Sequence, residues 1–209
     1  MIGTGVSEAQ PHFSGAAERN KQAIRDVLRS YLAPGAEVLE IASGTAQHAL
    51  HMAFTMPDIV WQPSDRDVDE YGLRDAIAGA TLENLRPPIV LDVTRFPTFR
   101  AEYDAVYSAN CIHVMPHENL AHYIAGAAKA LKPLGMMMLY GPFNYGGRYT
   151  GEGNERFDAF LAERYPGGGI RDFEEVDALA RRAGLQLHDD HAMPSDNRFL
   201  VWRNTAPVA

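Results

Sequence analysis

The sequence predicts an α/β fold in which helices cover both faces of a doubly wound, mostly parallel sheet. Strand-like apolar runs alternate with helix-like segments from residue 36 onward, a pattern typical of such sheets. One apolar run, from Val38, ends in a small-residue turn that reaches Ala46 and leads directly into helix-forming sequence. Polar residues close later runs at Asp65, Asp92 and Asn110, and open α/β sheets bind ligands at such strand ends.

The elements are expected in a simple order. A leading helix at 16–32 has apolar residues at helical spacing and ends before Pro34 and Gly35. Then follow a strand at 36–42, a helix at 46–56, a strand at 59–63, a helix at 67–79, strands at 88–92 and 103–109, and a helix at 117–131. The rest of the chain is expected as a strand at 136–140, a loop at 141–147, helices at 154–164 and 172–183, and closing strands at 185–191 and 199–202.

Length and composition predict one domain that spans residues 1–209. A chain of 209 residues with 46% hydrophobic content suits one large core better than two small ones. Residues 1–12 and 205–209 are expected to be loose tails. The glycine-rich segment 141–153 is a candidate lid loop over a binding site, or alternatively an ordinary surface loop.

Charge and cysteine content narrow the partners and the compartment. The formal net charge of −8 lacks the basic footprint of a nucleic-acid-binding protein. No apolar run approaches the roughly 20 residues of a membrane span, so no membrane partner is expected. The single cysteine, Cys111, excludes an internal disulfide and fits a reducing cytoplasm, which is the predicted location. The pattern leaves the oligomeric state open.

The turn after Val38 predicts a site for a nucleotide-type cofactor. Ala42, Ser43 and Gly44 lack bulk, so a ligand can approach the backbone closely at this strand end. Asp65 lies 21 residues beyond Gly44, the spacing of an acidic residue that accepts hydrogen bonds from ribose hydroxyls.

These motifs resemble the cofactor motifs of class I S-adenosylmethionine-dependent methyltransferases. The resemblance rests on residues 40–46, with the sequence Glu-Ile-Ala-Ser-Gly-Thr-Ala, and on the three polar strand ends. More narrowly, four stretches resemble a little-characterised subfamily of methyltransferase-like proteins of bacteria and animals: 18–21, 61–65, 140–143 and 169–172. The class implies a Rossmann-like, seven-stranded sheet with an antiparallel last strand. It also implies S-adenosylmethionine as the cofactor, lying over the ends of the first four strands.

The resemblance implies a role for each matched residue. Glu40 and the backbone of Ala42–Gly44 would face the methionine part of the cofactor. Asp65 would bind the ribose hydroxyls, and Asp92 would bind the adenine amino group.

Asn110 would lie where the methionine part meets the methyl acceptor, and Arg19 and Asn20 would contribute to the same region. One departure from the class is that alanines stand at 42 and 46, where glycines are usual. The extra methyl of Ala46 is expected to narrow the loop and weaken cofactor binding.

Each role has a simpler structural alternative. Glu40 is alternatively a buried carboxylate with a structural partner. Asp65 is alternatively a cap for a helix that starts at Val68. Asp92 is alternatively a turn residue bonded to its own backbone, and Asn110 a loop brace.

The histidine spacing offers a weaker alternative, a metal site. His48 and His51 lie three residues apart, and His113 and His117 lie four apart, spacings that can place two ligands on one helix face. Pro116 interrupts the second pair and no third ligand is evident, so no metal is predicted.

Methyl transfer from a sulfonium needs alignment of the reacting atoms more than it needs a base. If the acceptor must lose a proton, His113 and Tyr140 are the candidate catalytic residues, although a packing role for His113 remains open. Candidates for contacting the acceptor are Asn144, Arg148 and Arg171. The two arginines would clamp an acidic acceptor, or would alternatively be surface residues in salt bridges.

The sequence therefore predicts a methyltransferase that acts on a small-molecule acceptor. One alternative is a non-catalytic module that binds S-adenosylmethionine or S-adenosylhomocysteine and acts through a protein partner. Another is an NAD-dependent oxidoreductase, but a G-x-G-x-x-G turn aligned on Gly44 would need glycines at Ala42 and Gln47.

Overall fold

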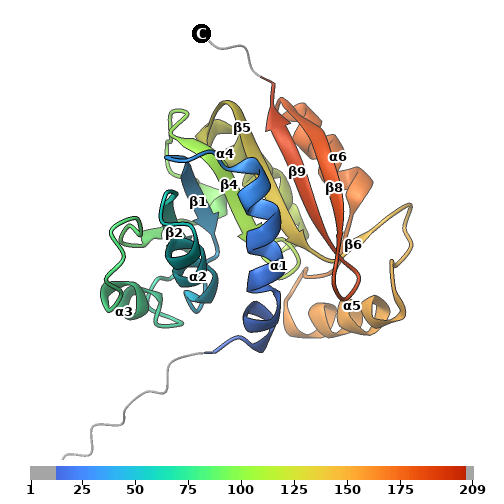
Figure 1. Ribbon diagram of the computed structural model, residues 1–209. Helices are drawn as coiled ribbons and strands as arrows, with labels where there is room; N and C mark the ends of the chain where they lie inside the picture. The colour runs from blue at the N-terminus through green and yellow to red at the C-terminus, as the bar shows by residue number, and fades with distance from the viewer. Residues whose placement is uncertain (1–12, 206–209) are drawn as a thin grey trace, which may run out of the picture.

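The computed structural model describes residues 13–205 and contains a seven-stranded sheet (Figure 1). The strand order is β3-β2-β1-β4-β5-β9-β8. Strands β3, β2, β1, β4 and β5 are parallel, whereas β9 is antiparallel to both of its neighbours. The strands are β1 (Glu37–Ile41), β2 (Val60–Asp65), β3 (Ile89–Val90), β4 (Tyr103–Ala109), β5 (Leu131–Gly141), β8 (Leu185–Met193) and β9 (Asn197–Asn204). The predicted fold class is confirmed, as are the seven strands and the antiparallel last strand.

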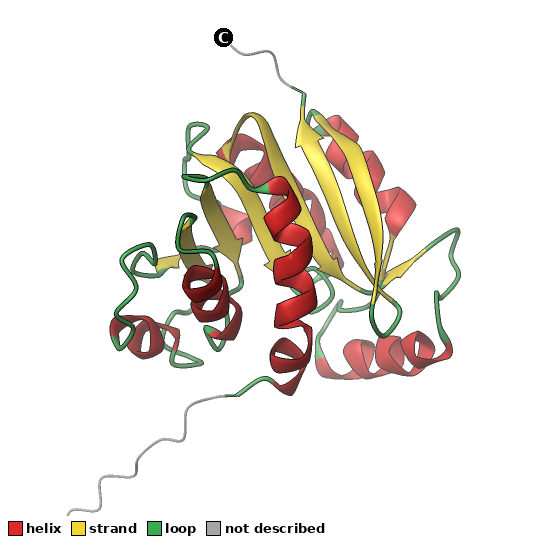
Figure 2. Cartoon of the chain, viewed as in Figure 1, coloured by secondary structure: helices red, strands yellow, loops and turns green. Residues whose placement is uncertain are grey.

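Helices cover both faces of this sheet, as Figure 2 shows. On one face lie α1 (Gly15–Tyr31), α2 (Gln47–Thr55) and α3 (Leu73–Ala78), which pack with Trp61 and Tyr107. On the other lie α4 (Leu120–Ala130) and α6 (Phe173–Arg182), which pack with Trp202. Helix α5 (Glu152–Arg164) lies beyond the end of the β8–β9 hairpin. Within residues 13–205, none of these helices combines the length and the apolar character that a membrane crossing requires.

Helix α1 packs on the same face of the sheet as α2 and α3, and it extends to the edge where the parallel strands end. It begins after Ser14, whose side chain accepts a hydrogen bond from the backbone N–H of Ala17 at 3.2 Å. Ile24 and Leu28 lie one helical turn apart and are fully buried against the sheet. The first turn of α1 therefore lies beside the strand ends (Figure 1).

Three elements are clearly shorter than the sequence predicts. The helix expected at 67–79 begins only at Leu73, because the side chain of Asp67 accepts hydrogen bonds from the N–H groups of Asp69 and Glu70 and forms a turn there. The strand expected at 88–92 has two residues. The helix expected at 117–131 starts as a 3₁₀ turn at His117–Asn119, after Pro116.

The prediction of a loop at 141–147 is wrong in part. A strand, β6 (Phe143–Asn144), pairs in parallel with β7 (Arg171–Asp172), and the backbones of Tyr145 and Arg148 form a bridge. The candidate lid 141–153 therefore starts with paired backbone. Of the predicted tails, residues 1–12 and 206–209 lie outside the described part of the chain.

Candidate functional site

The loop after β1 has the backbone shape that glycine-rich cofactor loops require. Ala42, Gly44 and Ala46 all have left-handed conformations, with φ of 61°, 52° and 65°. The backbone N–H of Ser43 donates to the carbonyl of Ser64 at 2.9 Å, and the N–H of Ser64 donates to Oγ of Ser43 at 3.1 Å. These two bonds fix the loop to the end of β2.

Ala46 does not fill the space that a cofactor would need. A Cβ built on Gly44 would meet no atom within 4 Å, so the space in front of this residue is open. Ala46 is fully buried and packs into the core beneath α2, away from that space. The loop therefore fits a nucleotide-type cofactor, and Ala46 affects backbone strain rather than the room for a ligand. A left-handed conformation at a residue with a Cβ costs about 1 kcal/mol.

A cavity of about 300 Å³ opens at this loop, and we call it the loop cavity. It is lined by Ser14, Ala17, Ala42, Ser43, Gly44, Thr45, His48, Tyr71, Ala109, Asn110 and Tyr165. Four predicted cofactor residues, Ala42, Ser43, Gly44 and Asn110, thus lie together.

A second cavity, of about 480 Å³, lies beside the first. We call it the α1–α5 cavity, because these two helices form its walls together with the end of β5 and the β8–β9 turn. It is lined by Ser14, Ala16, Arg19, Asn20, Ala23, Asn110, Tyr140, Pro142, Gly153, Asn154, Phe157, Pro194, Ser195 and Asn197. Ser14 and Asn110 line both cavities, so the two spaces meet at these residues.

The two acidic residues predicted nearest the loop are both occupied by hydrogen bonds. Asp65 accepts from the backbone N–H of Gly44 at 2.9 Å and from that of Arg66 at 2.7 Å, so it braces the loop cavity from outside its lining. Glu40 is buried, and its Oε2 accepts from the indole N–H of Trp61 at 2.8 Å. Burial raises the pKa of Glu40 to about 7, against the opposing effect of the bonds from Trp61 and Ser43. The bond to Trp61 favours a structural role for Glu40.

Asp92 is bonded to its own turn. Its Oδ1 accepts from the backbone N–H and from the hydroxyl of Thr94, each at 2.8 Å, and it caps the 3₁₀ turn Val93–Arg95. These bonds hold the pKa of Asp92 below its ordinary value. The contacts favour the turn interpretation, and the adenine role stays a prediction.

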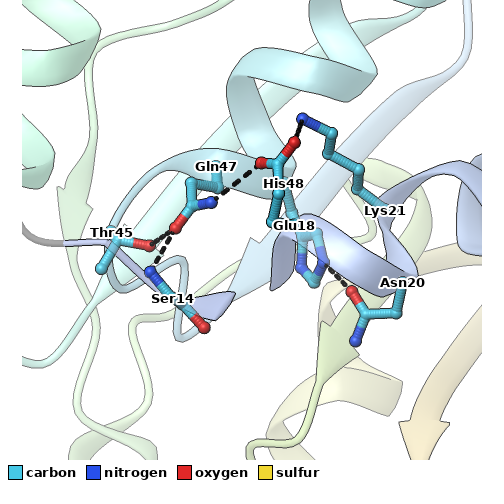
Figure 3. A network of polar contacts seen from close by, with 7 residues as sticks. All are labelled: Ser14, Glu18, Asn20, Lys21, Thr45, Gln47 and His48. Atoms are coloured by element: carbon cyan, nitrogen blue, oxygen red, sulfur yellow. Dashed lines mark hydrogen bonds and ion pairs between the residues drawn. The ribbon is translucent and has the colours of Figure 1, made fainter. Parts of the chain in front are cut away.

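A network of hydrogen bonds fastens α1 to the loop and to α2 (Figure 3). The backbone N–H of Ser14 donates to Oε1 of Gln47 at 2.5 Å, and Nε2 of His48 donates to Oδ1 of Asn20 at 2.8 Å. Burial lowers the pKa of His48 to about 4, so its ring is neutral at pH 7. Arg19 and Asn20 line the α1–α5 cavity together with Asn110 and do not line the loop cavity, and their role toward the cofactor stays a prediction.

The two candidate catalytic residues occupy different surroundings. Tyr140 lines the α1–α5 cavity, where burial raises its pKa and a side-chain hydrogen bond from Asn20 lowers it. His113 lines neither cavity and is 1% exposed. Its Nε2 would lie 2.2 Å from a Cβ added at Gly141, and its ring meets that of Phe143 edge-on. Burial, and then the charge of Arg171, lowers the pKa of His113 to about 3, so a packing role is favoured over that of a base.

The three candidate acceptor residues do not line either cavity. Arg171 is 5% exposed, and its guanidinium donates to the carbonyl oxygens of Ile112 at 2.9 Å, Met115 at 2.6 Å and Gly167 at 3.0 Å. Arg171 is therefore neither exposed to clamp a ligand nor part of a surface salt bridge, because its hydrogen bonds to these buried carbonyl groups hold it within the fold. Arg148 is exposed, and Asn144 lies in the β6–β7 pair.

Sequence reasoning missed several lining residues. Thr45 lies within the motif at residues 40–46, and its position between Gly44 and Ala46 in the turn after β1 indicates a place at the cavity. Tyr71 and Tyr165 come from distant loops, and no pattern marks them. Within the described residues, no group of three or more histidine, cysteine, aspartate or glutamate side chains is arranged to hold a metal ion.

The sheet order and the loop after β1 define the fold of class I S-adenosylmethionine-dependent methyltransferases, and solved structures agree. An O-methyltransferase family protein from Burkholderia thailandensis matches with a TM-score of 0.75 at 18% identity, over 91% of this chain and 59% of that protein. The mitomycin 7-O-methyltransferase MmcR matches with a TM-score of 0.74 at 16% identity, over 89% of this chain and 54% of MmcR. This chain thus spans little more than half the length of either protein.

A third match has a more similar length. In a complex with the Haloferax volcanii Trm112 methyltransferase activator, a chain matches with a TM-score of 0.71 at 14% identity, over 92% of this chain and 95% of that one. At these identities the likeness shows the fold. Residues 11–204 match the model of a family described as "protein of unknown function (DUF938)", and the chain belongs to this family.

Proposed function

We propose that this chain is an S-adenosylmethionine-dependent methyltransferase, built as one domain, that acts on a small-molecule acceptor. The observation that carries the proposal is the pair of cavities that meet at Ser14 and Asn110. One cavity opens at the cofactor loop, and the other has a volume within the usual range for small-molecule sites. Two reactants that must meet need two adjoining spaces of this kind.

The loop cavity supplies the groups that would hold the cofactor. Ser43, Gly44 and Thr45 present small residues and backbone groups, and Asp65 keeps the loop in shape through the Gly44 N–H. Each oxygen of Asp65 retains a second lone pair, so its predicted bond to a ribose hydroxyl is compatible with both backbone bonds. Asn110 has a left-handed backbone conformation, with φ of 52°, and lies where the two cavities meet.

S-adenosylmethionine supplies a methyl group on a sulfonium, and transfer forms a bond from the acceptor to the methyl carbon while sulfur keeps the electron pair of the broken bond. The chain's own contribution is to hold and align the acceptor and to exclude water. Phe157 of α5 and Pro142 cover the α1–α5 cavity with apolar surface. Since the pKa of Tyr140 is raised, its hydroxyl is protonated at pH 7 and donates a hydrogen bond rather than removing a proton.

Calorimetric titration with S-adenosylmethionine, S-adenosylhomocysteine and NAD in parallel tests the cofactor class. We expect the first two to bind and NAD not to bind. Binding of NAD alone would support the oxidoreductase alternative and overturn the proposal.

A second measurement separates catalysis from binding alone. Release of S-adenosylhomocysteine that depends on an added acceptor establishes the methyltransferase. One observation supports the non-catalytic alternative. Among the described residues that line the two cavities, the pKa of His48 is lowered to about 4 and that of Tyr140 is raised, so neither is matched to a general base at pH 7. Cofactor binding without turnover across a broad panel of acceptors would favour it.

A further inference from the structure

The α1–α5 cavity carries an unbalanced positive charge. Among the fourteen described residues that line it, Arg19 is the one charged residue. None of these described lining residues carries a carboxylate, although the chain as a whole has a net charge of −8. A lone cation that faces a cavity favours an anionic ligand there.

Arg19 is not used by the fold. Within residues 13–205 its guanidinium forms no ion pair and no hydrogen bond, whereas its neighbours on α1, Glu18 and Lys21, pair with each other at 2.5 Å. A Cβ added at Gly15 would lie 3.2 Å from Nη1 of Arg19. The guanidinium therefore folds back along α1 toward Ser14, where the two cavities meet.

A second donor is oriented into the same cavity. His48 donates to the amide oxygen of Asn20, so the amide nitrogen of Asn20 is left to donate to the hydroxyl oxygen of Tyr140. That oxygen then accepts from Asn20, and the hydroxyl proton of Tyr140 remains for a ligand. The chain of contacts from His48 through Asn20 fixes the direction in which Tyr140 donates.

We propose that the α1–α5 cavity binds a small carboxylic acid, whose carboxylate is held by the guanidinium of Arg19 and the hydroxyl of Tyr140. A guanidinium and a phenolic hydroxyl are both donors, and an ionised carboxylate accepts from both. Phe157 and Pro142 suit an apolar or aromatic body on the same ligand. The proposal rests on the proposed function, because it names the acceptor class of that site.

Paired probes test the charge requirement in protein saturated with S-adenosylhomocysteine. The acids are 4-hydroxybenzoate and phenylacetate, and each is compared with its primary amide by calorimetry or ligand-detected NMR. We expect each acid to bind at least ten times more tightly than its amide, since removal of a charged partner costs roughly ten- to a hundred-fold in affinity. Equal binding of acid and amide, or no binding of either acid, would overturn the proposal.

Variants of two arginines on the same helix test the residue. Arg19→Gln should lose the preference for the acids. Arg29→Gln should keep it, because Arg29 lies at the far end of α1 and pairs with Asp58 at 2.6 Å. A preference that survives Arg19→Gln would contradict the assignment.

The methionine part of the cofactor also carries a carboxylate. A third titration distinguishes binding of Arg19 to the cofactor carboxylate from binding to the acceptor carboxylate. We expect Arg19→Gln to bind S-adenosylhomocysteine within two-fold of the unaltered chain. A ten-fold loss would place Arg19 on the cofactor instead. Failure of the unaltered chain to bind S-adenosylhomocysteine would reject the proposed function, while the acid and amide probes, repeated without it, would still test Arg19.

Discussion

The carboxylate of Asp65 accepts a hydrogen bond from the backbone N–H of Gly44 across 2.9 Å. This bond joins the end of β2 to the turn after β1, so the acidic residue predicted to bind a ribose also shapes the loop on which the cofactor would lie. Ribose binding and loop bracing therefore depend on one side chain. Substitution of Asp65 tests both.

Asp65→Ala should weaken binding of S-adenosylmethionine by about 1–3 kcal/mol, because it removes an acceptor from the ribose and frees the Gly44 N–H. Calorimetry measures the change. Asp67→Ala is the matched control, since Asp67 bonds only to backbone N–H groups of its own turn, those of Asp69 and Glu70. Unchanged affinity in folded Asp65→Ala would remove Asp65 from the site.

The fold was predictable because it rests on local patterns. Apolar runs, helical spacing and polar strand ends are properties of short stretches, and they placed β4 at Tyr103–Ala109 with both ends correct. The pairing of β6 with β7 was not predictable, since it joins two-residue segments that lie far apart in the chain.

The site was predictable only where its residues follow strands. Ala42, Ser43, Gly44 and Asn110 line the loop cavity, as expected of strand ends. The surroundings of Arg171 depend on three carbonyl oxygens supplied by other segments, and no spacing in the sequence shows that they converge.

Ala46→Gly should change the free energy of unfolding by less than about 0.5 kcal/mol. Relief of left-handed strain, about 1 kcal/mol, offsets the lost burial of a methyl group, about 0.8 kcal/mol, and part of the added chain entropy. Ala49→Gly, at a buried position within α2, should cost about 2 kcal/mol, because it gains no relief of strain. Urea denaturation measures both variants, and equal losses would contradict the strain at Ala46.

Glu40→Gln should change how stability depends on pH. The pKa of Glu40 is raised from 4.5 to about 7 by burial, so the folded chain binds its proton more tightly than the unfolded chain does. The tighter proton binding adds about 3 kcal/mol to the free energy of unfolding below pH 4.5, and this stabilisation is lost as the pH rises to about 7. Urea denaturation at pH 5 and pH 8 should therefore show Glu40→Gln gaining stability relative to the unaltered chain at the higher pH.

The control for this pair of measurements is Glu37→Gln, on the same strand, where the carboxylate is partly exposed and pairs with Arg86. It should not reproduce the gain at pH 8. Parallel pH dependence in Glu40→Gln and the unaltered chain would show that Glu40 is ionised at little cost in the folded state.

Arg171→Met should destabilise the fold by about 2–4 kcal/mol, because three buried carbonyl oxygens lose their donor while the apolar stem is kept. Arg148→Met, at an exposed position, should stay within about 0.5 kcal/mol of the unaltered chain. Urea denaturation at pH 7 compares the two. If Arg171→Met kept full stability and instead lost binding of the carboxylic acid probes, the guanidinium would belong to the acceptor site, and the carbonyl contacts would not be what holds it.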